Sequence, residues 1–155
     1  MKIAVATDHA GFPLKDIVLE VVRAAGHETL DLGTDSTDPV DYPDFAERLG
    51  RAIQSGEAER GILLCGSGVG ASIAANKMTG VYAAVCHDTY SAQQGVEHDD
   101  MNVLCLGGRI IAPEPMREIV KSFLKARFIG NDPGQNRHRR RVEKIRRIEA
   151  SQSGG

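Results

Sequence analysis

Short apolar runs alternate with amphipathic segments along most of the chain. Each apolar run has the length and composition of a strand in a parallel sheet, and these runs cover 2–7, 27–32, 61–65, 81–86 and 102–108. Between and after them, apolar residues recur at helical spacing, which predicts helices over 13–25, 43–55, 71–77, 90–98, 113–128 and 139–149. The pattern therefore predicts a chain in which strands and helices alternate.

This alternation predicts an α/β fold. Strands connected by helices form one parallel sheet with right-handed crossovers and helices on both faces. We expect a three-layer α/β/α sandwich, Rossmann-like, with a five-stranded sheet and an additional C-terminal helix; the order of the strands stays open. A chain of 155 residues fits one domain, which we place at 1–150, with 151–155 as a flexible tail.

Composition narrows the classes of function. The formal net charge is −2 and 41% of the residues are hydrophobic. The chain therefore lacks the overall basicity that favours nucleic-acid binding. No apolar run approaches the length of a membrane span, and the first residues lack the apolar segment of a signal peptide, so we expect a cytoplasmic protein. Three widely spaced cysteines match neither a disulfide framework nor a zinc pattern, and we expect reduced thiols.

One loop concentrates the candidate chemistry. The predicted strand 61–65 ends in Cys65, and Gly66, Gly68 and Gly70 alternate before the next helix. A glycine loop between a parallel strand and a helix leaves backbone N–H groups uncovered at the carboxyl edge of the sheet, where an anion binds. The Cys65 thiol would share this site, and there it could act as a base or a nucleophile.

Other readings of this loop remain open. Gly66-x-Gly68-x-x-Ala71 also satisfies a dinucleotide fingerprint, with Asp88 at about the right distance to meet a ribose. Against it, the motif follows the third strand and no chain is left for a substrate domain. The loop lacks the Gly-Lys-Ser/Thr of a P-loop, and a cysteine phosphatase would need arginine at the position of Ala71. The glycines could also serve only close packing of strand and helix.

The histidines could bind a metal or act as a general acid. His9, His87 and His98 each lie beside an acidic residue, but no helical pair at i, i+4 supports a metal site, and such pairs are often local surface contacts. His98 ends a predicted helix, where a general acid is plausible.

A basic segment begins near residue 137. Helical spacing would put Arg137 and Arg141 on one face, and Glu143 and Glu149 interrupt the charge. A clamp for a small phosphate fits this pattern better than a nucleic-acid patch or a solvated face, and Arg109 could add another donor. If the last helix cannot fold back to its own Cys65, a partner subunit must supply these arginines.

Several motifs together carry a resemblance to a known family. They are Asp8-His9-Ala10-Gly11, Asp41-Tyr42-Pro43, Cys65-Gly66-Ser67-Gly68-Val69-Gly70, Ala74-Ala75-Asn76-Lys77, Tyr90-Ser91-Ala92, Glu97-His98, Gly107-Gly108-Arg109 and Arg137-His138-x-x-Arg141-Val142. In this order, the chain resembles the type B ribose-5-phosphate isomerases from residue 2 to about 149. The galactose-6-phosphate and allose-6-phosphate isomerases belong to the same family. The resemblance implies a metal-independent enzyme without a cofactor, which forms homodimers or tetramers with active sites shared between subunits.

The resemblance also implies roles for individual residues. Cys65 would be the base that moves a proton between C1 and C2 through an enediolate, and His98 would assist opening of the furanose ring. Ser67 and the amides of Gly66, Gly68, Val69 and Gly70 would stabilise the developing oxyanion. Asp8 and Tyr42 would contact the sugar, and His9, Arg109, Arg137 and Arg141 would hold the phosphate.

Two residues depart from the family pattern. Ser67 stands where many members have threonine, which keeps the hydroxyl, and Asp99 stands where asparagine is usual, which leaves its sugar contact open.

The expected reaction is interconversion of ribose 5-phosphate and ribulose 5-phosphate, a step of the pentose phosphate pathway in carbohydrate metabolism. Galactose 6-phosphate, allose 6-phosphate or a tetrose phosphate is the alternative substrate, and a nucleotide-binding module is the alternative from another class.

Overall fold

A computed structural model describes residues 1–153 and contains the expected parallel sheet. The strands are β1 (Lys2–Thr7), β2 (Glu28–Asp31), β3 (Arg60–Cys65), β4 (Ala83–Val85) and β5 (Val103–Gly107). Their order is β2-β1-β3-β5-β4, and every neighbouring pair is parallel. The predicted five-stranded α/β fold is therefore confirmed, and the strand order, which the sequence left open, is now known.

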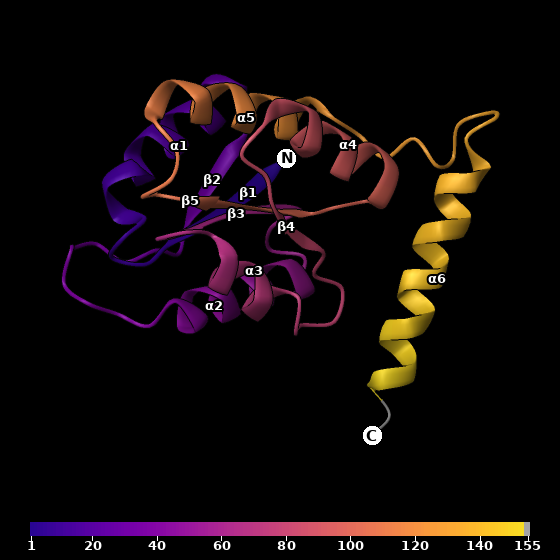
Figure 1. Ribbon diagram of the computed structural model, residues 1–155, viewed down its shortest axis with the longest axis horizontal. Coiled ribbons are helices and arrows are strands. Elements are labelled where there is room, and N and C mark those ends of the chain that lie inside the picture. Colours follow the sequence, from indigo (N-terminus) through magenta and orange to yellow (C-terminus); the bar gives the residue numbers. More distant parts are fainter. Residues whose placement is uncertain (154–155) are drawn as a thin grey trace.

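Helices cover both faces of this sheet (Figure 1). They are α1 (Phe12–Ala24), α2 (Tyr42–Gln54), α3 (Val69–Ala75), α4 (Thr89–Asp99), α5 (Pro113–Lys125) and α6 (Asn136–Gln152). Helices α1, α4 and α5 bury their apolar sides on one face, in a core that includes Phe123 and Leu104. Helices α2 and α3 bury a smaller, alanine-rich core around Leu49 and Leu63 on the other face. Successive side chains of a strand point to opposite faces, so both cores draw on the same strands.

Several predicted boundaries differ from the structure. Helix α3 spans Val69–Ala75 rather than 71–77, so it begins within the glycine loop. Helix α5 ends at Lys125 rather than at 128. The Arg60 guanidinium donates hydrogen bonds to the carbonyls of Phe123 and Ala126, each at 2.8 Å, and so occupies carbonyl oxygens that a further helical turn would use. Strand β4 is limited to Ala83–Val85. Helix α6 begins before 139 and continues to Gln152, so part of the predicted tail is helical, and 154–155 lie outside the described residues.

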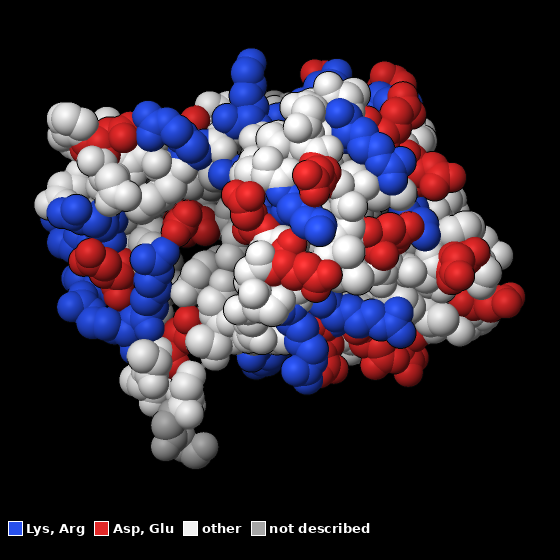
Figure 2. Space-filling model, turned by 180° about the vertical axis from the view of Figure 1, so that it is seen from behind, with Lys and Arg blue, Asp and Glu red and all other residues white. Residues whose placement is uncertain are grey.

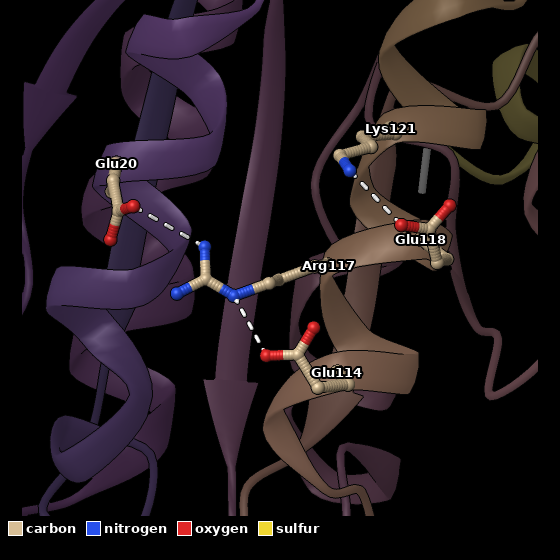
Figure 3. Close-up of polar contacts among 5 residues, drawn as sticks. All are labelled: Glu20, Glu114, Arg117, Glu118 and Lys121. Carbon is tan, nitrogen blue, oxygen red and sulfur yellow. Dashed lines mark hydrogen bonds and ion pairs between the residues drawn. The ribbon is translucent and has the colours of Figure 1, made fainter.

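Polar contacts also join α1 to α5 at the surface (Figure 3). Arg117 on α5 pairs with Glu20 on α1 and with Glu114 on its own helix, both at 3.4 Å, and Lys121 pairs with Glu118 at 3.0 Å. The carboxylates are largely exposed, so each pair contributes at most about 1 kcal/mol. The buried apolar contacts between these helices therefore dominate their packing.

Helix α6 stands beside the sheet next to α4 rather than on a face of the sheet (Figure 1). Polar contacts hold it: Arg146 pairs with Asp100 at 2.6 Å, and Glu149 accepts hydrogen bonds from the Gly80 N–H and the Tyr82 hydroxyl. Val142 is buried on its inner side. None of the helices among residues 1–153 combines the length and apolar character needed to cross a membrane.

Candidate active site

The strand order creates a crevice between the carboxyl ends of β1 and β3. From β1 the chain continues to β2 on one side, whereas from β3 it continues to β4 and β5 on the other side. Ligands of parallel α/β sheets bind where the chain reverses direction in this way. Asp8 follows β1 directly and Cys65 ends β3, so both side chains reach this crevice.

A pocket of about 650 Å³ opens at the crevice. Its lining residues are Asp8, Tyr42, Cys65, Gly66, Ser67, Val69, Gly70, Ile73, Arg109 and Ile110. Eight of these ten residues are predicted site residues, and they come from the loop after β1, the start of α2, the β3–α3 loop, the start of α3 and the turn after β5. Ile73 and Ile110 were not predicted, because an exposed apolar residue on a short helix or turn carries no chemical signal.

The glycine loop holds the Cys65 thiol by a backbone contact. The Gly68 N–H donates to the Cys65 Sγ at 3.1 Å. Gly68 has a left-handed backbone with φ of +81°, and a methyl group there would lie 3.0 Å from the Leu106 carbonyl carbon. The left-handed backbone and the lack of room for a methyl group both require glycine at position 68. With glycine there, the loop can close around the Cys65 sulfur, as the spacing of the glycines suggested.

The other two cysteines belong to the core. Burial raises the pKa of the Cys86 thiol to about 11, and burial raises the pKa of the Cys105 thiol even more strongly. Neither lines the pocket. Of the three cysteines, Cys65 is the one placed to reach a bound ligand.

Two polar side chains flank the thiol. The Asp8 carboxylate accepts hydrogen bonds from the amides of Ala10 and Gly11, at 2.9 and 3.0 Å, which fix it in the wall of the pocket. The Ser67 hydroxyl oxygen accepts the Val69 N–H at 3.2 Å. Its hydroxyl hydrogen remains free to donate to an oxygen of a ligand.

Tyr42 and Gly70 bring the starts of α2 and α3 into contact. A methyl group at Gly70 would lie 2.5 Å from the Tyr42 Cζ, so the tyrosine ring rests directly against the glycine backbone. The Tyr42 side chain is nevertheless 39% exposed. The ring therefore forms a wall of the pocket, and it can also meet a ligand.

His9 and Arg109 complete this region. The His9 Nδ1 accepts the Val40 N–H at 3.1 Å, which ties the exposed loop before α2 to the end of β1. The Arg109 N–H donates to the Gly66 carbonyl at 3.0 Å, and the Arg109 side chain lines the pocket. Arg109 is therefore positioned to attract an anionic group.

Four predicted site residues lie elsewhere. His98 and Asp99 end α4, and Arg137 and Arg141 lie on α6; none of them lines the pocket around Cys65. The His98 ring stacks on His138 of α6, with ring centres 4.0 Å apart. Figure 2 shows Lys and Arg side chains gathered along α6, and they form a basic surface beside α4.

His138 is the residue that sequence reasoning passed over within this second cluster. It is buried, and its Nε2 has no hydrogen-bond partner among the described residues. Burial lowers its pKa, and the neighbouring His98, Arg137 and Arg141 lower it further. The available signal was its position between two arginines of one helix, three residues before Arg141.

The alternatives from the sequence find less support in the geometry. The Asp88 carboxylate accepts the Ser91 N–H at 2.6 Å and caps α4, so it is engaged locally rather than placed for a ribose. Across residues 1–153, no group of three or more histidine, cysteine, aspartate or glutamate side chains could hold a metal ion.

Comparison with known proteins identifies relatives over nearly the full length. Ribose-5-phosphate isomerase B of Escherichia coli is 44% identical over 148 residues, which cover 96% of both chains. D-erythrulose-4-phosphate isomerase of Pectobacterium atrosepticum is 41% identical, covering 94% of this chain and 93% of that protein.

Solved structures and a family model agree with these relatives. The structure of Clostridium thermocellum ribose-5-phosphate isomerase B superposes with a TM-score of 0.91 at 44% identity, covering 97% of this chain and 99% of the other. The family model described as Ribose/Galactose Isomerase matches residues 3–145. The chain therefore belongs to the Ribose/Galactose Isomerase family.

Proposed function

We propose that the protein is an aldose–ketose isomerase that interconverts ribose 5-phosphate and ribulose 5-phosphate. The observation that carries this proposal is the pocket at the crevice, where one thiol, one serine hydroxyl and a glycine loop meet an arginine. A base beside hydrogen-bond donors is the arrangement needed to form and stabilise an enediolate. Similarity to isomerases of phosphorylated sugars supports the same reaction class.

In the proposed reaction, Cys65 acts on the open-chain sugar. The thiolate removes the C2 proton, the electron pair forms a C1–C2 double bond, and negative charge collects on the C1 oxygen. The thiol then returns the proton to C1, the proton of the C2 hydroxyl passes to the C1 oxygen, and a ketone forms at C2. The reaction is balanced without an external oxidant or reductant, so the proposal includes no cofactor and no metal.

The residues around the thiol have complementary tasks. The Ser67 hydroxyl donates to the developing oxyanion, together with amides of the Gly66–Gly70 loop. In the ligand-free chain, two of these amides already have partners, since Gly68 donates to the thiol and Val69 donates to Ser67. These weak contacts can be exchanged for bonds to substrate oxygen. Asp8 and Tyr42 bind sugar hydroxyls, and His9 and Arg109 bind the phosphate.

We propose that a second copy of the chain completes this site. His98, Asp99, Arg137 and Arg141 lie on α4 and α6, away from the pocket of their own chain. The pocket rim exposes apolar side chains, namely Val69 (54%), Ile73 (60%) and Ile110 (63%), which a partner would cover. In such a homodimer, or in a tetramer of two dimers, the partner's His98 opens the furanose ring and its arginines hold the phosphate.

The identity of the sugar has a second candidate. A relative at 41% identity is named D-erythrulose-4-phosphate isomerase, so a tetrose phosphate is a reasonable alternative to ribose 5-phosphate. Asp99 bears on this choice, because a carboxylate only accepts hydrogen bonds where an amide would also donate. Galactose 6-phosphate and allose 6-phosphate are the hexose alternatives.

The test is a substrate panel without added cofactor or metal. We expect ribulose 5-phosphate to form from ribose 5-phosphate, with a higher kcat/KM than for the three alternative sugars. A higher kcat/KM for D-erythrulose 4-phosphate would replace the pentose with the tetrose and leave the reaction class intact. Absence of turnover with every sugar phosphate would contradict the isomerase proposal.

A further inference from the structure

His87 makes an unusual contact just beyond the end of β4. Its Nε2 accepts the Gly107 N–H at 2.9 Å. In the β4–β5 ladder, the Val103 N–H donates to the Tyr82 carbonyl, and Val85 is paired with Cys105. Gly107 lies two residues further along β5, where a continuing β4 would supply the next acceptor. The imidazole takes the place of that acceptor after the β4 chain has left the sheet.

The end of β5 supports the loop that carries the thiol. The Gly108 N–H donates to the Cys65 carbonyl at 2.7 Å, and the Arg109 N–H donates to the Gly66 carbonyl at 3.0 Å. A methyl group at Gly107 would lie 2.8 Å from the carbonyl carbon and oxygen of Ser67. The contact between the two backbones is therefore close, and a shift of Gly107 is transmitted to the Cys65 loop.

We propose that His87 is a positioning residue for the isomerase reaction. Through its bond to Gly107, His87 fixes the position of the turn after β5. This turn fixes the positions of the Cys65–Gly68 loop and of the Arg109 side chain. His87 does not line the pocket, so it acts without touching the substrate. The inference rests on the proposed function for its effect on turnover, whereas the contact with Gly107 is independent of that function.

The contact assigns a role to each ring nitrogen. Because Nε2 accepts the Gly107 N–H, the ring proton lies on Nδ1 in this contact. The proposed role therefore depends on a hydrogen-bond acceptor at the position of Nε2.

Two substitutions test the acceptor at the position of Nε2. His87→Ala removes the acceptor and leaves the Gly107 N–H unpaired, and we expect kcat to fall about threefold to tenfold with KM within about twofold. His87→Gln offers a carbonyl oxygen near the position of Nε2 and should restore most of kcat. The matched control is His27→Ala, since His27 Nδ1 also accepts a hydrogen bond, from the Met1 amino group, but His27 precedes β2 and does not line the pocket.

The split between kcat and KM, and the rescue by glutamine, are readouts that a merely structural role would not change. Equal kcat for His87→Ala and wild type would overturn the proposal. Equal losses in the Ala and Gln variants would overturn it as well, because the acceptor would then be irrelevant.

Two measurements remain informative if the protein turns over no sugar phosphate. Hydrogen exchange of the Gly107 amide should be faster in His87→Ala than in wild type and His87→Gln. The rate of Cys65 alkylation by iodoacetamide, followed by mass spectrometry, should change in the same variant and not in His27→Ala. Unchanged exchange and alkylation would refute the positioning role, whereas absent turnover with changed alkylation would refute only the proposed function.

Discussion

Replacement of Gly70 by alanine tests the packing of Tyr42 against the start of α3. The new methyl group would lie 2.5 Å from the Tyr42 Cζ and 2.8 Å from its hydroxyl oxygen. The ring must recede by about 1 Å to reach an ordinary contact distance. Because the atoms involved are at the far end of a partly exposed side chain, the ring can turn toward solvent and the backbone can stay in place.

The consequences for stability and activity should differ. Alanine gains up to about 1 kcal/mol over glycine within a helix, and this offsets the partial loss of packing of the tyrosine. The free energy of unfolding should therefore change by less than about 1 kcal/mol. If Tyr42 hydrogen-bonds the sugar as proposed, its displacement removes about 0.5–1.5 kcal/mol of transition-state binding, which lowers kcat/KM by up to about tenfold.

A double-mutant cycle in an isomerase assay identifies the cause of this loss. Gly70→Ala should lower kcat/KM in the wild-type background but have little further effect in a Tyr42→Ala background, where no ring remains to be displaced. Urea unfolding of all four proteins provides the stability control. An equal loss in both backgrounds would show that the methyl group itself obstructs the substrate, and the reasoning from Tyr42 would be wrong.

Three further predictions concern the assembly, metals and pH. Mixing inactive Cys65→Ala and Arg141→Ala proteins by co-refolding should restore activity, because one site of a hetero-dimer then has both residues; verified hetero-dimers without activity would show that each chain supplies its own arginine. Treatment with a chelator should leave turnover unchanged, and a loss that one divalent ion reverses would contradict the metal-free mechanism. Because the folded-state pKa of His138 lies below 6.5, docking of α6 should be strongest above pH 6.5 and weaken as the pH falls below it. Hydrogen exchange of α6 at pH 7.5 and 5.5 measures this, and His138→Gln should remove the difference.

Local signals in the sequence explain how much of the site could be predicted. The alternating glycines after Cys65 identified the loop, since only a tight turn with close backbone contact needs them, and the structure places Gly68 in a left-handed conformation there. Asp8 was placed on the same edge because parallel strands end at one edge of a sheet. Their neighbourhood depends on β1 and β3 being adjacent, and no local pattern determines strand order.

The features that the sequence did not predict depend on contacts between distant residues. Arg60 ends α5 by bonding the Phe123 and Ala126 carbonyls, across more than sixty positions of the chain. The stacking of His98 on His138 and the contact of His87 with Gly107 likewise join separate elements. Composition and periodicity report which face of a helix is apolar, but not which side chain of another element meets it.

If Cys65 is the base of a sugar-phosphate isomerase, turnover of ribose 5-phosphate depends on its thiol, and an assay of Cys65→Ala measures this dependence. Loss of a catalytic base lowers the rate by a factor of about 10² to 10⁴. The matched control is Cys86→Ala, which removes a buried thiol outside the pocket. We expect ribulose 5-phosphate formation to be lost in Cys65→Ala and retained in Cys86→Ala, with phosphate-ligand binding intact in both. Normal turnover by folded Cys65→Ala would contradict the assignment of the base.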